Sequence, residues 1–212
     1  MRLPPLVLLS VLLVPAPVVL ATPAIEITVS GTITPAACRP AFSNQGKIDF
    51  GTIAFRELNE DSHTTLEEQT MTLTVECDSA TRFGLLAHDN RRGSSTAVNF
   101  FGLGRSDNKK IGHYQLTVDP HDAQVDGEPG YVTRGLSGGV LWERSSAGSY
   151  DLGTGAHYIG FSASPGHTNG PDALTEVRTD IRLSAQVAPS RDLPATEDIA
   201  LDGAVSFEVR YL

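Results

Sequence analysis

The chain has 212 residues, of which 25 are acidic and 16 basic, so that its net charge is −9. This acidic balance, with no run of Lys or Arg longer than a pair, argues against nucleic acid or an anionic membrane surface as a partner. A chain of this length can bury a core without metal ions or many disulfides.

The first 21 residues predict export. Arg2 is followed by an uncharged apolar run that ends in Ala21, which is typical of a cleaved secretory signal. A membrane anchor is the alternative, but four prolines interrupt the run and no basic cluster follows it. We therefore expect cleavage of the signal peptide 1–21, no membrane span afterwards, and one domain formed by residues 22–212.

Apolar and polar residues alternate along most of the remaining chain, which predicts half-buried β-strands. The expected strands are 25–33, 47–55, 70–77, 82–88, 111–119, 138–143, 157–163, 180–188 and 204–212. Turn clusters rich in Gly, Asn, Asp and Pro separate them, and the one helical signal is a single turn within 59–69. Many short strands with frequent turns predict an all-β fold, an antiparallel β-sandwich with long loops.

The two cysteines, Cys38 and Cys77, are expected to form a disulfide rather than a metal or redox site. Zinc needs four ligands, and neither cysteine has a second Cys or a paired His at ligand spacing. Cys77 shares the inward face of its strand, and Cys38 is expected in a turn after Pro35. The bond would tie the start of the fold to a central strand and stabilise it by about 4 kcal/mol in the chain-entropy description.

The tests for chemistry predict no catalytic residue, no metal site and no cofactor, and hence no enzyme. Ser137, within "GLSGG", matches a nucleophile elbow in letters, but a strand is expected after it where the elbow needs a helix. The six histidines form no metal-binding pair, and the carboxylates of 119–127 lack the spacing of an EF-hand loop. The lone tryptophan, Trp142, is expected in the core, and a hydrolase using Ser137 is the weakest functional hypothesis.

Asp89, Asn90 and Arg91 form a polar cluster where a predicted strand ends. One interpretation is an Asp/Asn turn in which Arg91 pairs locally with Asp89. The other is a loop that holds a small ligand or a sugar, because loop residues at strand ends often carry function. Both interpretations stay open on the sequence.

Several motifs together resemble a known group of proteins. "SGTITPAAC" and "LTVEC" stand where chaperone–usher fimbrial subunits, or pilins, have their paired cysteines, and Tyr211 is penultimate as in many pilins. The set "VSGTITPAACRP", "IDFGTI", "DNR", "FFGLG" and "IGHYQLTV" is similar to the proteobacterial fimbrial-like family called domain of unknown function 1120. The likeness spans nearly all of the chain after the signal.

The resemblance implies an immunoglobulin-like, pilin-like sandwich that lacks its last strand and is completed by a strand from another protein. Val205, Phe207, Val209 and Tyr211 would pack on the core while their backbone forms or borders that strand-addition edge. A periplasmic chaperone and fimbrial subunits would be the partners, in the periplasm or at the cell surface. The resulting expectation is a fimbrial-like structural or adhesion protein; the alternative is a self-contained periplasmic module that binds a ligand or sugar.

Overall fold

The computed structural model describes residues 37–143, 148–155, 157–165, 169–194 and 198–212, and only the backbone of Ser137. The expected strand 25–33 and the signal 1–21 lie outside the described residues. The described part contains strands and short 3-10 turns, with no α-helix and no helix long and apolar enough to span a membrane.

The long strands are arranged in two layers. They are β3 (Gln69–Thr81), β4 (Phe83–Asp89), β8 (Gly112–Val125), β9 (Glu128–Leu136), β13 (Leu174–Val187) and β14 (Val205–Tyr211). The short strands are β1 (Cys38–Phe42), β2 (Thr64–Thr65), β5 (Phe101–Gly102), β6 (Arg105–Ser106), β7 (Lys109–Lys110), β10 (Leu141–Glu143), β11 (Tyr150–Asp151) and β12 (Tyr158–Ser162). The 3-10 turns are η1 (Ser43–Gly46), η2 (Phe55–Glu57), η3 (Ser137–Gly139) and η4 (Ser190–Asp192).

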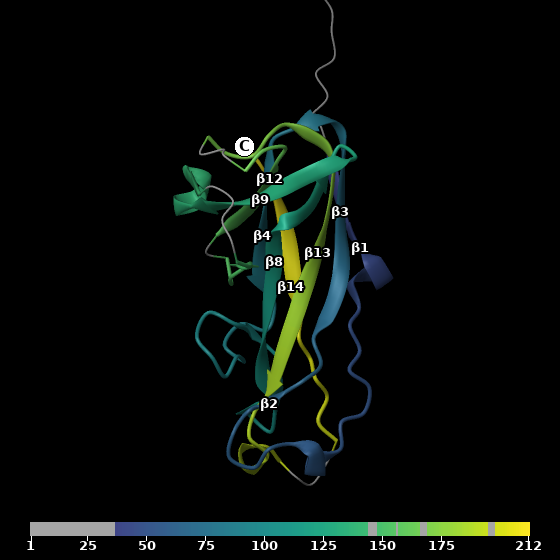
Figure 1. Ribbon diagram of the computed structural model, residues 1–212. Coiled ribbons are helices and arrows are strands. Elements are labelled where there is room, and N and C mark those ends of the chain that lie inside the picture. The colour runs from purple at the N-terminus through teal and green to yellow at the C-terminus, as the bar shows by residue number, and fades with distance from the viewer. Residues whose placement is uncertain (1–36, 144–147, 156, 166–168, 195–197) are drawn as a thin grey trace, which may run out of the picture. The chain divides into compact units, whose positions relative to one another are not determined.

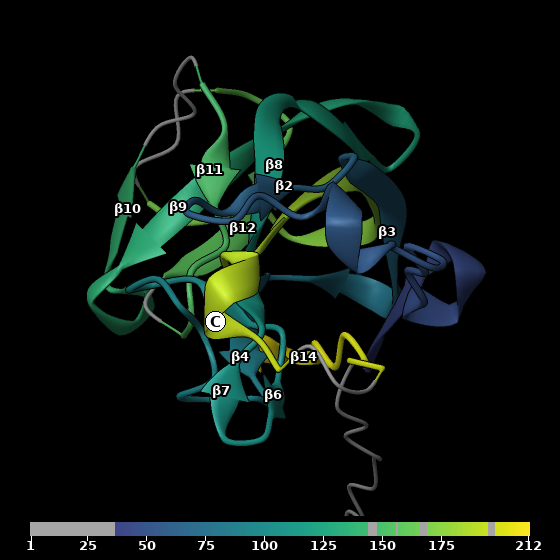
Figure 2. The ribbon, with the colours of Figure 1, turned by 90° about the horizontal axis from the view of Figure 1, so that it is seen from below.

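All the strand ladders are antiparallel, in the order β1-β3-β13-β8-β9-β12-β4-β14. The first four strands of this order form one layer and the last four form the other, and the β8–β9 hairpin carries the chain between the layers (Figure 1). Figure 2 looks along the strands, with β9 and β10 on one side and β3 on the other. The predicted all-β antiparallel sandwich is confirmed.

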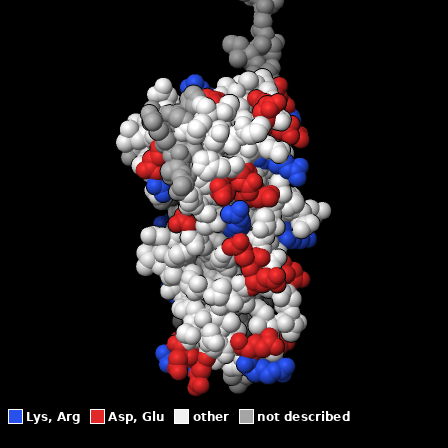
Figure 3. Space-filling view, in the orientation of Figure 1, with Lys and Arg blue, Asp and Glu red and all other residues white. Residues whose placement is uncertain are grey.

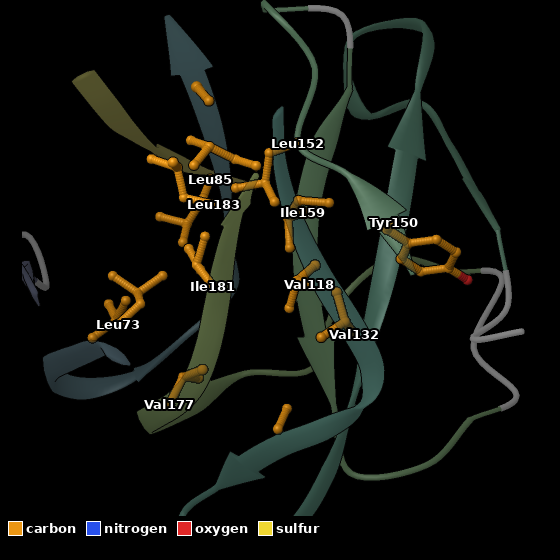
Figure 4. Packing of buried hydrophobic residues seen from close by; sticks show 14 of the residues in the cluster. Leu73, Leu85, Val118, Val132, Tyr150, Leu152, Ile159, Val177, Ile181 and Leu183 are labelled. Carbon is orange, nitrogen blue, oxygen red and sulfur yellow. The ribbon is translucent and has the colours of Figure 1, made fainter. Parts of the chain in front are cut away.

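The core lies between the two layers, and inward residues of both contribute to it. Leu85 on β4 and Ile159 on β12 are buried together with Val118 on β8 and with Ile181 and Leu183 on β13 (Figure 4). These side chains come from strands whose sequences alternate with a period of two, so one face of each strand enters the core. Burial of this face on both layers explains why the pattern predicted the strands.

Trp142 occupies a slot that glycines make. A Cβ built on Gly135 would come within 3.0 Å of the indole ring, and one on Gly160 within 2.7 Å, which is closer than side-chain packing allows. The indole Nε1–H donates to the carbonyl of Gly139 at 2.9 Å, so its one polar group is satisfied. Trp142 is 8% exposed, as expected of a core residue.

Most strand predictions match the structure within a few residues, and three features differ. Residues 47–55 form no strand, residues 59–69 contain no helical turn, and the strand expected from 138 is shortened to β10 by the η3 turn. β8 and β13 are longer than expected because the β8–β9 hairpin extends both. Ser137 lies in η3 and is followed by a strand, so the strand-to-helix turn of a nucleophile elbow is not formed there.

Candidate functional site

One side of the sandwich is open where the two layers end. β14 pairs with β4 along seven residues, and no described strand pairs with its other edge. β1 ends the opposite layer and pairs with β3 alone among the described strands. The two end strands are not paired with one another, and the rings of Phe42 and Phe207 lie 5.0 Å apart between them. We call this region, from β1 to β14, the open side.

The inward residues of β14 line the open side, and their burial differs from what was expected. Val205, Phe207 and Val209 pack against the core but are only half-buried. Tyr211 is 54% exposed, so its predicted packing in the core is wrong. Its hydroxyl instead accepts a hydrogen bond from the backbone N–H of Cys38 at 3.0 Å and thus bridges the open side. The reason is the position of β14, because an edge strand has neighbours on one side only.

An apolar cavity of about 410 Å³ lies behind these side chains. Its walls come from both layers and include Phe42, Met71, Leu116, Ile181 and Phe207. Tyr114 also lines it, and burial, followed by the charge of Asp89, raises the pKa of that phenol, which therefore stays neutral. The volume falls in the range of protein pockets that hold a ligand or an inserted side chain.

A second cavity of about 570 Å³ continues the open side beyond the N-terminal end of β14. It shares Ile48, Phe50 and Leu201 with the first cavity. Most of its lining comes from two segments, 48–55 and 198–201, which run side by side below β1 and β14 (Figure 1). Leu58, Ile111, Val187 and Leu193 complete it. The apolar floor of the open side is therefore longer than β14 itself.

The surroundings of the segment 47–54 explain why the strand predicted there is absent. Its alternation is real, because Ile48 and Phe50 are half-buried. η1 precedes it with left-handed backbone at Asn44 and Gln45, with φ values of 52° and 57°, and ends the pairing of β1 with β3. Within the described part of the chain, the backbone N–H groups of Ile48 and Phe50 have no hydrogen-bond partner. The segment has the sequence of a strand without a neighbouring strand.

The disulfide joins Cys38 and Cys77 as predicted. The two residues are directly opposite one another in the β1–β3 ladder, so Cys38 begins a strand and the expected turn at this position is wrong. Five paired residues alone would hold β1 weakly, because short edge strands depend on few contacts. The covalent bond therefore fixes the β1 wall of the open side.

The polar cluster Asp89, Asn90 and Arg91 supports the other wall. Arg91 donates from Nε and Nη2 to both carboxylate oxygens of Asp202 at 2.7 and 2.6 Å, and its hydrogen bonds lower the pKa of Asp202. Asn90 donates to the carbonyl of Ala204 and, from its side chain, to Ser206. Of the interpretation as a local turn, the Asp89 turn is present, but the Arg91 guanidinium pairs with Asp202 and not with Asp89.

Asp89 itself accepts from two backbone groups, the N–H of Arg91 at 2.7 Å and the N–H of Gly102 at 3.2 Å. A hollow of about 430 Å³ adjoins it, lined by His88, Arg92 and Phe100 among others. The cluster thus positions the start of β14 and also borders a polar hollow. Its role as a ligand loop stays a prediction.

The remaining sequence candidate, 119–127, has its carboxylates engaged by the protein. Asp119 and Asp122 lie in a bulge of β8 and face Arg182 at 4.0 and 3.7 Å. Asp126 accepts hydrogen bonds from the hydroxyl and the backbone N–H of Thr175 and from the N–H of Glu176. Among the described residues, no group of three His, Cys, Asp or Glu side chains is arranged to hold a metal ion.

No pattern in the sequence marks three contributors to the open side, namely Phe42, Asp202 and Leu201. They lie at the end of a short strand or in extended chain between elements, where no periodic pattern marks them. The "DNR" motif was a usable signal for a polar cluster, but not for its partner 111 positions away.

A known protein family and two known proteins are similar to this chain. The family described as "Protein of unknown function (DUF1120)" matches residues 27–100, which include both cysteines, β3, β4 and the Asp89–Arg91 cluster. The chain is 27% identical over 220 residues to the Escherichia coli K12 "Uncharacterized protein YhcF", covering 89% of this chain and 90% of that protein. It is 26% identical over 223 residues to "Protein GltF" of the same organism, with 88% of each chain covered. None of these descriptions states an activity.

Proposed function

We propose that the protein is a fimbrial-like structural or adhesion protein that accepts an extended strand from another protein along its open side. After cleavage of the signal, the protein would lie in the periplasm or at the cell surface. It would be a member of the family whose model matches residues 27–100. The strand donor would be a periplasmic chaperone or a fimbrial subunit. The protein would act by binding and assembly and not as an enzyme.

The observation that carries the proposal is the edge of β14 that no described strand pairs, above an apolar cavity. An edge strand exposes a row of backbone N–H and C=O groups, which a further strand can pair. Here the edge adjoins the 410 Å³ cavity, where alternate side chains of an added strand would fit. Main-chain hydrogen bonds would supply affinity, and the cavity would select large apolar side chains.

The segment 47–54, which lines the open side, supports the same function. The segment 47–54 has alternating apolar residues and lacks a neighbouring strand among the described residues. A strand lying between this segment and β14 would give both of them a hydrogen-bonded neighbour. The acidic and basic side chains are interspersed on the face in Figure 3, which shows no continuous basic patch. Strand pairing and apolar contacts, rather than charge, would therefore dominate recognition.

The test uses the behaviour of the purified protein alone and with a probe strand. The probe is a synthetic peptide of the chain's own alternating residues 24–34, with a scrambled peptide of the same composition as control. We expect the protein alone to self-associate, and the probe, but not the scrambled peptide, to give a soluble complex. A stable monomer that ignores the probe would contradict the proposal.

Two matched variants locate the effect on β14. Phe207→Asp places a charge over the cavity and should abolish periplasmic accumulation and probe binding, because a buried charge there has no partner. Glu208→Lys lies on the other face of the same strand, next to His88 at 2.9 Å, and should be mild. If a chain lacking residues 205–212 were soluble, protease-resistant and obtained at normal yield, β14 would be dispensable and the proposal wrong.

The second candidate is a self-contained periplasmic module that binds a small ligand or sugar. The hollow of about 430 Å³ beside Asp89 favours it, because its lining includes both polar side chains and the aromatic side chain of Phe100. Such a module would be a stable monomer without any added strand, and Asp89→Ala would remove ligand binding. The oligomeric state of the purified protein thus separates the two candidates.

A further inference from the structure

Two histidines distant in sequence converge on one hydroxyl group beside the region where β13 pairs with β2 and β8. His113 is on β8, and His63 lies in the loop before β2. Thr96 Oγ1 is 2.8 Å from His113 Nδ1 and 3.1 Å from His63 Nε2. The two imidazole centroids are 5.2 Å apart. We call these three residues the His–Thr–His clasp.

The clasp joins two loops to the sheet. Thr96 is held on β8 a second time, because its backbone N–H donates to the carbonyl of Gly112 at 3.3 Å. His63 belongs to the loop between Leu58 and Leu66, both of which pack on a small apolar cluster around Val187. Without the clasp, this loop would be held by its two ends, by the pair of Asp61 with Arg191 and by the hydrogen bond from Ser190 N–H to the carbonyl of Asn59.

The number of protons in the clasp decides whether both hydrogen bonds form. A threonine hydroxyl carries one proton, so between two neutral rings it accepts from one nitrogen and donates to the other. One added proton on the pair preserves this arrangement. A second proton makes both ring nitrogens donors and places two positive charges at a ring separation of 5.2 Å.

The surroundings offer no charge that would offset double protonation. Among the described residues, no carboxylate pairs with either ring. Asp61, in the same loop as His63, pairs with Arg191. Lys110, three positions before His113 in the chain, donates from its ammonium group to the carbonyl of Ser95 at 2.7 Å. His113 is 8% exposed and its ring contacts that of Phe100. Burial, and then the charge of His63, lower the pKa of His113.

We propose that the His–Thr–His clasp is an acid-labile closure, which holds the loops 59–63 and 94–97 on β8 until both rings are protonated. The inference is independent of strand addition at the open side. Acid weakens the folded state because the pKa of His113 is lowered there, so that the unfolded chain binds more protons than the folded one. The contribution of the clasp to stability is complete above about pH 6.5 and falls as the pH drops toward the folded-state pKa of His113.

The first test is amide hydrogen exchange of the purified protein at about pH 7.5 and about pH 5.0, corrected for intrinsic rates. We expect residues 59–66 and 94–97 to lose protection about tenfold at the lower pH, while residues 177–187 of β13 keep theirs. Equal changes in the loops and in β13 would overturn the proposal.

The second test is an NMR titration of the imidazole rings. The midpoint of His113 should lie below 6.5 and should rise in His63→Gln, which keeps a hydrogen-bonding group but removes the second charge. His88→Gln, at the exposed pair with Glu208, is the control and should leave the midpoint unchanged. A His113 midpoint at or above 6.5 in the unaltered protein would overturn the closure even if His63→Gln does not fold.

Discussion

β13 and β14 have the same alternating pattern and different surroundings. β13 is paired on both edges, with β3 and β8, and its inward residues Val177 and Ala185 are 0% exposed. β14 is paired with β4 alone among the described strands, and its inward residues are half-buried or, at Tyr211, exposed. Alternation therefore sets which face of a strand is apolar, whereas the number of neighbouring strands sets how far that face is buried.

The largest expected effect is in the closed part of the core. Phe161 is 1% exposed and packs near Phe83. Phe161→Ala should lower the free energy of unfolding by about 3–5 kcal/mol, because a cavity forms that its neighbours cannot fill. Urea unfolding followed by fluorescence measures it. A loss below that of a β14 substitution would remove the distinction between the two regions.

The disulfide should have the next largest effect, because it anchors β1, which is paired with β3 along five residues. Cys38→Ser combined with Cys77→Ser should cost about 2–4 kcal/mol, since the bond closes a long loop of the unfolded chain. Thermal unfolding with and without reductant gives the value, and mass spectrometry under non-reducing conditions checks that the unaltered protein is oxidised. Free thiols in exported material would contradict the role assigned here.

Phe207→Ala is the counterpart of Phe161→Ala on the open side. The half-buried ring contacts Phe42 across the gap. Its removal should cost about 1–2 kcal/mol, because the side chain already contacts solvent and the site can relax. The same urea unfolding measurement compares the two phenylalanines directly. Equal losses would show that β14 is as fully enclosed as β12.

Asp126 tests a polar contact that pins the β8–β9 hairpin to β13. Burial by itself would raise the pKa of its carboxyl group, but the hydrogen bonds from Thr175 and Glu176 lower it. The contribution is therefore present above the unfolded-state pKa of about 4 and is lost as the pH falls through the folded-state value.

Asp126→Ala should cost about 1 kcal/mol at neutral pH after allowance for its exposure to solvent. The difference from the unaltered protein should shrink on acidification toward pH 3, as read from unfolding curves at a series of pH values. Asp107→Ala, in the separate β6–β7 hairpin, is the control. A difference that does not change with pH would mean that the charge of Asp126 is not involved.

The smallest expected effect is Tyr211→Phe, which removes only the hydroxyl that bridges to Cys38. The bond is exposed, so its loss should cost about 0.5 kcal/mol or less. Faster amide exchange at Cys38, with unchanged exchange in β3, would locate the loss at the open side. A cost as large as that of Phe207→Ala would instead make Tyr211 a main support of β14.

The fold class and most strands could be predicted because each follows from a local pattern with a period of two. The prediction of a strand at 47–55 failed for the complementary reason, because a strand also needs a neighbour and no local pattern specifies one. The role of Arg91 was likewise out of reach, since its partner Asp202 is brought to it only by the pairing of β4 with β14.

The apolar face of each strand, the all-β class and the pairing of the two cysteines follow from the sequence, because they depend on alternation and residue count. The folded arrangement sets three further features: β1 and β14 end their layers facing one another, Tyr211 bridges them, and Thr96 joins His63 to His113. Strand order and loop contacts depend on which distant segments become neighbours, and that choice is made by the packing of the whole sandwich.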